Sequence, residues 1–528
     1  MSIIAISFLV LLLFNIIKGE FVLGKLQQNL YNEDSKYLNW IFENKKITFF
    51  SLDFLALICL VVAKCSTKQL VLPMILLSFA FYFLEACRIL SLKQTEISNQ
   101  KFILSKRMKR LIVTLSIFYI IPLVFYLINY ENGTLALIIE GSFTYFLYYL
   151  AFICKFLNAP IEKWMNHYNY EKAREKIESM KNLEVVGITG SYGKSSTKQI
   201  VNTVLSEQSL CQMTPKNLNT IHGLVTTINN YLDQNEKYFI VEMGSYKSGE
   251  VSTICGLAKP KYAILTNIET INLESFGTME DAIKAKFELI ESLDEDGIAI
   301  LNKDDYRQVE HVVESPCKKV WVSIEQEADY MATDIKYSKE GTSFIFHSKS
   351  SGENYKVETR LLGKHNVYHI LSTMALAKEM GISDEKIKSA LSKLRPLENH
   401  LEIQNYGYMH QINNTHRSNP QGASNALEVL HLMPGTRVVV TTGMQTLGEK
   451  NNEFNNIFGS QVAKVADYVI LIGEKSTKSV FKGLMESGFN QKKVYIVNRV
   501  SDAYTLLQEI KTKKEIYALF ESDEDLKD

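Results

Sequence analysis

The sequence of 528 residues has no excess of charge of either sign, and it has few cysteines. Its 58 lysines and arginines balance 58 aspartates and glutamates, so the formal net charge is zero. Proteins that bind nucleic acid through a general electrostatic field carry a basic excess, so we expect no nucleic-acid partner. The seven cysteines are scattered and form no Cys-x-x-Cys pair and no cluster with histidine. We expect reduced thiols in a cytoplasmic domain and no structural zinc.

Long hydrophobic runs are missing after residue 156, where the composition is that of a soluble protein. Before that point the chain is rich in Phe, Leu, Ile and Tyr, and five apolar stretches approach the ~20 residues that a membrane-spanning helix needs. The stretches are residues 1–17, 47–63, 70–89, 111–130 and 134–153. The first lacks a basic start and a small-residue cleavage site, so we interpret it as an anchor and not as a signal peptide. The first two are the shortest, and either could be re-entrant.

The basic residues between these stretches indicate their orientation. Lys and Arg are abundant between the first and second stretches, between the third and fourth, and after the fifth, and they are sparse in the other two connections. Cytoplasmic loops carry more Lys and Arg, so the N-terminus is expected outside and everything after the fifth stretch in the cytoplasm. We predict a multi-pass protein of a bacterial cell membrane, with about five helices over 1–156. A charged helical linker is predicted over 157–182.

Three carboxylates interrupt the apolar stretches, namely Asp53, Glu85 and Glu140. Ionisable residues are costly in a bilayer and usually face a partner or a cavity. They could line a pocket for a lipid-linked substrate, or they could join neighbouring helices or lie at the membrane interface. Contact between helices is the simpler interpretation, and both stay open.

The most informative motif follows the linker. An apolar run over 183–188, typical of a buried strand, meets a glycine-rich turn and then a helical pattern. Glycines let backbone N–H groups turn inward around an anion, and a helix N-terminus adds its positive dipole end. A lysine in such a loop reaches the β- and γ-phosphates, and the following serine can hold Mg²⁺, so we predict ATP and Mg²⁺ as cofactors. The predicted phosphate-binding residues are Gly190, Ser191, Tyr192, Gly193, Lys194, Ser195 and Ser196.

Short β-branched runs alternate with helical patterns from residue 183 onward, which predicts mostly parallel sheets covered by helices. The expected fold class is therefore an α-helical membrane region followed by α/β, with a P-loop-type central domain over 183–395 and a smaller Rossmann-like domain over 396–528. We place the boundary at Pro396, where proline interrupts a helical pattern. Glu242 ends a predicted strand at the edge where open α/β sheets bind ligands, and there it could hold Mg²⁺.

The order of motifs resembles that of the Mur ligases over about residues 180 to 525, most closely the members that add D-alanyl-D-alanine to the peptidoglycan precursor. The motifs are Thr-Gly-x-x-Gly-Lys-Ser-Ser, Asn-Leu-Asn, Val-Glu-Met-Gly, Leu-Thr-Asn-Ile, Leu-Asn-Lys-Asp-Asp and His-Asn-Val, in this order. The resemblance implies an ATP-dependent ligase that forms an amide bond through an acyl phosphate.

The resemblance also implies roles for single residues. Lys194 would contact the phosphates, and Ser195 and Glu242 would coordinate the first Mg²⁺. Lys286 matches the lysine that is carbamylated in the family and helps to place a second Mg²⁺. The further residues implied at the nucleotide are Asn302, Asn366 and Asn414.

Several positions depart from the family pattern. Asn272 stands where the family has a metal-proximal histidine, and His400 stands where it has an arginine that reaches ATP. Asn413 and Asn414 replace two carboxylates. Two hypotheses follow: an active membrane-anchored ligase, or a catalytically weak paralogue that binds ATP and acts as a partner or regulator. The predicted catalytic residues are Lys194, Lys286, Asn272 and His400.

Members of the family normally begin with a small domain that grips the UDP of a soluble precursor, and here the apolar region stands in its place. We therefore expect a small-molecule or lipid-linked wall precursor as the substrate, met at the membrane. A partner ligase or another envelope-synthesis protein is a further expected partner.

Overall fold

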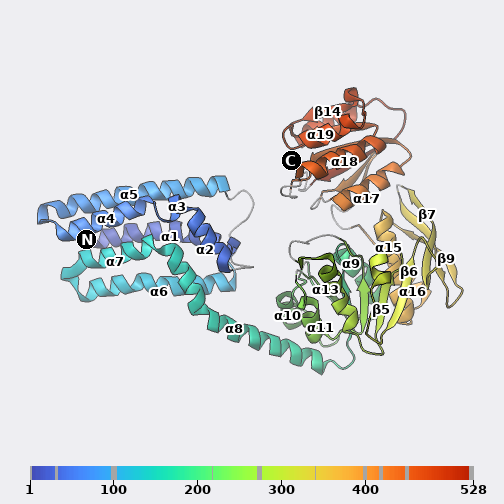
Figure 1. Ribbon diagram of the computed structural model, residues 1–528, viewed down its shortest axis with the longest axis horizontal. Coiled ribbons are helices and arrows are strands. Elements are labelled where there is room, and N and C mark those ends of the chain that lie inside the picture. The colour runs from blue at the N-terminus through green and yellow to red at the C-terminus, as the bar shows by residue number, and fades with distance from the viewer. Residues whose placement is uncertain are drawn as a thin grey trace. The chain divides into compact units, whose positions relative to one another are not determined.

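The computed structural model describes residues 3–29, 34–96, 104–216, 218–245, 247–269, 276–338, 340–396, 401–415, 420–445 and 451–522. The chain divides into two compact units, Met1–Tyr168 and Asn169–Asp528. We call them unit 1 and unit 2 and describe each by itself (Figure 1).

Unit 1 is a bundle of helices. Among the described residues, four helical segments are long and apolar enough to cross a membrane. The number rises to five if α7 and α8, which are bent by 79° where they meet, form one broken span. The sequence predicts about five and allows a break in either of the first two, whereas the structure has the break in the last. The helices are α1 (Ile3–Asn29), α2 (Asp34–Glu43), α3 (Lys45–Thr48), α4 (Leu52–Cys65), α5 (Lys68–Glu96), α6 (Lys106–Ile128), α7 (Gly133–Tyr145) and α8 (Leu147–Ser179), with the turn η1 (Tyr130–Asn132) before α7.

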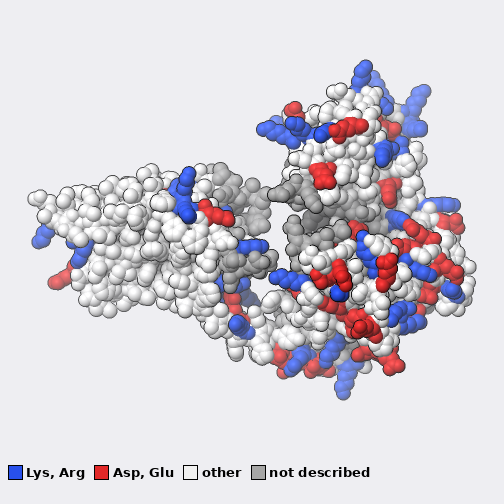
Figure 2. Space-filling view, in the orientation of Figure 1, with Lys and Arg blue, Asp and Glu red and all other residues white. Residues whose placement is uncertain are grey.

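The outer surface of unit 1 is apolar. Figure 2 shows few charged side chains on it, whereas Lys, Arg, Asp and Glu gather over unit 2. Large hydrophobic side chains are exposed on α4, α5 and α6, among them Phe54, Phe83 and Val113. A continuous apolar surface of this kind is unfavourable in water and favourable against lipid, since all backbone groups inside helices are already paired.

The three carboxylates within the apolar stretches are buried and contact neighbouring helices. Lys18 of α1 forms a buried ion pair with Asp53 of α4. Glu140 of α7 accepts a hydrogen bond from Asn15 of α1 at 3.5 Å. Glu85 of α5 accepts one from the backbone at the start of α4 at 3.2 Å. These contacts join four helices, which is the simpler of the two roles that the sequence leaves open.

The first sheet of unit 2 has nine strands in the order β2-β3-β1-β4-β5-β6-β7-β8-β9. Neighbours are parallel from β2 to β7, and the last two pairs are antiparallel. The strands are β1 (Glu184–Thr189), β2 (Cys211–Met213), β3 (Tyr238–Glu242), β4 (Tyr262–Leu265), β5 (Ile298–Asn302), β6 (Lys318–Ser323), β7 (Tyr330–Ser338), β8 (Gly341–Ser348) and β9 (Asn354–Thr359).

Helices cover both faces of this sheet, which is why its central parallel strands are continuous apolar runs. One core joins the sheet to α9 (Lys194–Ser206), α15 (Lys364–Glu379) and α16 (Asp384–Lys393). A second core, on the other face, contains α10 (Ile221–Asn230), α11 (Glu250–Ala258), α13 (Met279–Glu291) and the end of α8. The short helix α14 (Tyr306–Glu310) follows β5.

The second sheet has six strands in the order β10-β11-β15-β12-β13-β14. Only the pair β10–β11 is antiparallel. Helices α17, α18 and α19 pack on one face and α20 on the other. The elements are β10 (Glu402–Tyr406), β11 (Met409–Asn414), α17 (Pro420–His431), β12 (Thr436–Gly443), α18 (Asn451–Val465), β13 (Tyr468–Ile472), α19 (Lys478–Glu486), β14 (Val494–Val497), α20 (Val500–Glu509) and β15 (Ile516–Ser522).

Candidate functional site

The glycine-rich loop connects β1 to α9 at the carboxyl edge of the first sheet. Gly190 and Gly193 have φ angles of 142° and 78°. A Cβ atom on Gly190 would lie 2.0 Å from Oγ1 of Thr266, and one on Gly193 would lie 2.1 Å from the ring of His369. Both positions therefore require glycine. Gly193 is the N-cap of α9, so the first N–H groups of this helix belong to the loop, an arrangement that favours an anion.

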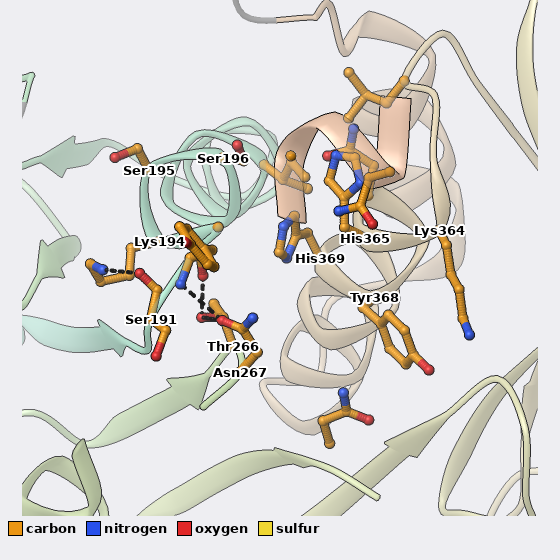
Figure 3. Close-up of a pocket in the computed structure, with 18 of the residues that line it drawn as sticks. Ser191, Lys194, Ser195, Ser196, Thr266, Asn267, Lys364, His365, Tyr368 and His369 are labelled. Carbon is orange, nitrogen blue, oxygen red and sulfur yellow. Dashed lines mark hydrogen bonds between the residues drawn. The ribbon is translucent and has the colours of Figure 1, made fainter. Parts of the chain in front are cut away.

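The segment after β4 fixes the path of this loop. The backbone N–H of Ser191 donates to the carbonyl oxygen of Asn267 at 2.8 Å, and that of Tyr192 donates to the side-chain oxygen of Asn267 at 2.9 Å. The Thr266 hydroxyl donates to the carbonyl oxygen of Tyr192 at 2.6 Å. In Figure 3, Lys194, Ser191, Thr266 and Asn267 lie together on one side of the cavity.

Lys194 is the cation of the loop. Its Nζ donates to the carbonyl oxygens of Gly190 at 2.7 Å and Ser191 at 3.0 Å. Burial lowers the pKa of Lys194, and the carboxylate of Glu242 acts in the opposite direction. A largely desolvated ammonium group interacts strongly with any anion that replaces the two carbonyls.

Glu242, at the end of β3, is the carboxylate next to the loop, and it is 3% exposed. It accepts hydrogen bonds from the hydroxyl of Ser195 at 2.9 Å and from the amide of Asn219 at 3.2 Å. Lys198 forms an ion pair with it at 2.8 Å. A hydroxyl and a carboxylate oxygen side by side are ligands that Mg²⁺ accepts together with phosphate oxygens and water. Ser195 and Glu242 therefore fit a Mg²⁺ ion, with Lys198 as its competitor for the carboxylate.

Lys286 lies on α13 and is 5% exposed. Its Nζ is 5.5 Å from the ring centroid of Phe276. Burial, and secondly the charge of Lys194, lower the pKa of Lys286 to about 8. The two lysines are thus close enough to interact, although Lys286 is outside the lining of the cavity described next.

A cavity of about 880 Å³ lies in front of the loop. The walls come from the loop, the ends of β3, β4 and β5, the start of α15, and the region of β11 and α17. Figure 3 shows Lys364, His365 and Tyr368 on the α15 side of the cavity, whereas His369 of the same helix lies next to the loop. Gly190 does not line the cavity. Asn272 and His400 lie outside the described residues. The predicted residues that line it are Ser191, Tyr192, Gly193, Lys194, Ser195, Ser196, Glu242, Asn302, Asn366 and Asn414.

The predicted nucleotide residues on β5 and α15 are held by neighbouring groups. Asn302 accepts a hydrogen bond from the backbone N–H of Asp304 at 3.0 Å. Asp304 in turn accepts from the hydroxyl of Tyr368 at 2.8 Å, which ties this loop to α15. The amide of Asn366 donates to the carbonyl oxygen of Leu362 at 2.7 Å. Their roles toward a nucleotide stay predictions.

Sequence reasoning missed three residues of this region. Lys198 follows Lys194 by one helical turn, a spacing that would have identified it. His369 lies under the loop, and burial, with a smaller effect of His365, lowers its pKa to about 3. Glu521 accepts a hydrogen bond from the amide of Asn414 at 2.7 Å. Because 107 residues separate the members of this last pair, only the order of the strands reveals it.

The fold and the site define an α/β protein with a glycine-rich loop, followed by a helix N-terminus, at the carboxyl edge of a parallel sheet. Residues 188–377 match the Mur ligase middle domain. The chain is 31% identical over 299 residues to the UDP-N-acetylmuramoyl-tripeptide–D-alanyl-D-alanine ligase of Escherichia coli K12, covering 55% of the chain and 65% of that protein. It is 28% identical over 284 residues to the Bacillus subtilis ligase of the same name, covering 53% and 60%. The chain thus spans less than two thirds of the length of these relatives.

Solved structures have the same fold. A MurF structure from Acinetobacter baumannii has a TM-score of 0.60 at 22% identity and covers 68% of this chain and 78% of its own. MurF ligase from Thermotoga maritima, solved in complex with ADP, has a TM-score of 0.57 at 23% identity and covers 68% and 80%. The matching family model and these relatives are those of Mur ligases, which confirms the resemblance in the motifs.

Proposed function

We propose that this chain is an ATP-dependent ligase that joins a carboxylate to an amine on a precursor of the bacterial cell envelope. One observation carries the proposal. A single cavity brings together the glycine-rich loop, the buried ammonium of Lys194, and the adjacent oxygens of Ser195 and Glu242. A cation, a helix N-terminus and a carboxylate–hydroxyl pair are the groups that a nucleotide triphosphate with its metal requires.

The reaction needs two displacements. A substrate carboxylate oxygen attacks the γ-phosphorus of ATP, which forms an acyl phosphate and releases ADP. The amine nitrogen then adds to the acyl carbon, and the tetrahedral intermediate collapses with loss of phosphate and a proton. The chain contributes positioning and charge neutralisation. The loop N–H groups and Lys194 hold the phosphates in line, and Ser195 and Glu242 would hold Mg²⁺, which neutralises phosphate charge when bound.

Lys286 has the property that carbamylation requires. Only a neutral amine adds to carbon dioxide, and a pKa of about 8 leaves about a tenth of the amine neutral at pH 7, far more than an ordinary lysine has. The nitrogen bonds to the carbon of CO₂ and loses a proton to water, which turns a buried cation into an anion beside Lys194. The carbamate oxygens are suited to a second Mg²⁺.

We further propose the domain organisation given above, with membrane helices over 1–156, a linker over 157–182, and ligase domains over 183–395 and 396–528 in the cytoplasm. The apolar helices of unit 1 support membrane anchoring. The distribution of Lys and Arg between them favours an N-terminus outside. An anchored ligase meets its substrate at the bilayer, so we infer a lipid-linked wall precursor in preference to a soluble one.

A second function is favoured by one observation. Asn413 and Asn414 are amides where the family resemblance implies carboxylates, and Asn414 lines the cavity. Loss of a charged partner at such a site costs on the order of 10²–10³ in rate. The chain would then bind ATP without turnover and act as a partner or regulator of another ligase.

Phosphate release from ATP tests both functions. The detergent-solubilised full-length protein is assayed with Mg²⁺, cell-wall lipid extracts and candidate amino acids, beside Lys194→Ala and the matched control Lys284→Ala. Lys284 is an exposed lysine on α13, so its variant should behave as the wild type. Release that depends on Lys194 and on one extract supports the ligase. ATP binding without release above Lys194→Ala supports the paralogue, and absence of ATP binding refutes both.

A further inference from the structure

We propose that Glu521 is a positioning residue that holds the side-chain amide of Asn414 with its oxygen toward the cavity, as an acceptor for a hydroxyl or ammonium group of the ligand. The inference rests on the function proposed above. It adds that one side of the cavity presents a hydrogen-bond acceptor to the ligand.

The two residues are neighbours at the ends of adjacent strands. Asn414 is the last residue of β11 and is paired in register with Glu521 of the parallel strand β15. The Asn414 amide nitrogen donates to Oε2 of Glu521 at 2.7 Å. Glu521 is 1% exposed and Asn414 is half-buried, so the hydrogen bond between them is partly buried. Hydrogen bonds to an ionised group are short and strong, and a buried one keeps its geometry well.

The carboxylate decides which way the amide points. An ionised carboxylate has only acceptor atoms, so the NH₂ group of Asn414 must face Glu521. Asn414 also lines the cavity. The carbonyl oxygen is on the side of the amide away from Glu521, and we infer that it faces the cavity. Without Glu521 the amide could turn over and present a donor instead.

This polarity selects a class of ligand group. A carbonyl oxygen backed by a buried negative charge attracts a hydrogen-bond donor and repels phosphate and carboxylate oxygens. Both a ribose hydroxyl of the nucleotide and the nitrogen of the incoming amine are donors.

Exchange of the two side chains tests the inference. Glu521→Gln removes the constraint on the amide, and we expect ligand affinity to fall about fivefold, the effect of one ordinary hydrogen bond. Asn414→Asp places two carboxylates together, and we expect a loss of about tenfold or more. The double variant Asn414→Asp/Glu521→Gln restores one amide and one carboxylate with their places exchanged. It should recover to within about threefold of the wild type, because the two sites are coupled.

The readouts separate a ligand role from a structural one. Equilibrium affinities are measured for ATP, 2′-deoxy-ATP and 3′-deoxy-ATP, together with the KM for hydroxylamine in hydroxamate formation and the melting temperature. If the donor is a ribose hydroxyl, Glu521→Gln weakens ATP and spares the analogue that lacks that hydroxyl. If it is the amine, nucleotide affinities are unchanged and the KM rises. Changes in melting temperature alone would overturn the inference.

A matched control pair lies in the same unit. The amide of Asn456 donates to the carboxylate of Glu486 at 2.9 Å. Asn456 is half-buried, Glu486 is exposed, and neither residue lines the cavity. Asn456→Asp/Glu486→Gln and its single variants should leave every affinity unchanged. Wild-type protein that binds no ATP would refute the proposed function. Wild-type protein that binds ATP, with no loss and recovery in the exchange series, would refute only the role of Glu521.

Discussion

Replacement of Lys286 by methionine should stabilise the first sheet and its helices near neutral pH. Methionine is similar in length and has no charge to desolvate. The pKa of Lys286 falls from 10.5 to about 8 in the folded protein. At about pH 7 the charged form of Lys286 is therefore less favourable in the folded protein than in the unfolded chain, by about 3 kcal/mol.

The sign of the pH dependence follows from the same shift. Between pH 8 and pH 10.5 the unfolded chain binds more protons at this lysine than the folded chain does. Stability of the wild type must therefore rise with pH in this window, and the cost of Lys286 disappears above it. The advantage of Lys286→Met should shrink from about 3 kcal/mol at pH 7 to about 1 kcal/mol at pH 10.

Hydrogen exchange of the α13 amides measures this difference locally in the full-length protein. The buffers must be free of carbon dioxide, because a carbamate would change the charge of the wild type. Lys284→Met makes the same change on the exposed side of α13, and its effect should stay within about 0.5 kcal/mol. A Lys286→Met protein no more stable than the wild type at pH 7, or a difference independent of pH, would refute the reasoning.

Three further predictions concern steric fit, metal binding and the membrane helices. Gly193→Ala should lower the free energy of unfolding by about 1–3 kcal/mol because φ is positive at this position, and it should abolish ATP binding measured by calorimetry. The double variant Gly193→Ala/His369→Ala should recover only the part of the loss that is due to contact with the histidine ring. Lys198→Met removes the cation that competes with a metal ion for the carboxylate of Glu242, so the affinity for Mn²⁺ should rise. The rise is about tenfold if the ion pair contributes about 1.4 kcal/mol, and electron paramagnetic resonance measures it. An unchanged affinity would contradict this reasoning. Lys18→Met should destabilise the detergent-solubilised protein by about 3–5 kcal/mol by leaving Asp53 buried and unpaired, and the double variant with Asp53→Leu should regain most of it. A double variant as unstable as Lys18→Met would show that the pair is not the cause.

The parallel core of the fold could be predicted because its strands are short apolar runs, each followed by a helical pattern. The sequence gives no comparable pattern for β15, which is central in the second sheet. Residues 516–520 form one brief apolar run after a lysine-rich segment, and periodicity alone cannot separate such a strand from a piece of helix. The antiparallel strands β7, β8 and β9 were also missed, since they alternate without a helical crossover.

The loop could be predicted for a similar reason. Its glycines, Lys194 and Ser195 are contiguous in sequence, and local geometry fixes what they do. Asn414 and Glu521 meet only because β11 and β15 are neighbours, and strand order cannot be read from one sequence. His369 was missed because a histidine on a helix gives no sign that it lies beneath a distant glycine.

His369 also affects how the cavity responds to acid. With a pKa of about 3, this histidine stays uncharged through the whole physiological range. Its ring fills the space next to Gly193, and mild acidification would not change its charge. Any dependence of ligand binding on pH between pH 5 and 7 must then come from other groups, while the volume of the ring limits which residues fit beside Gly193.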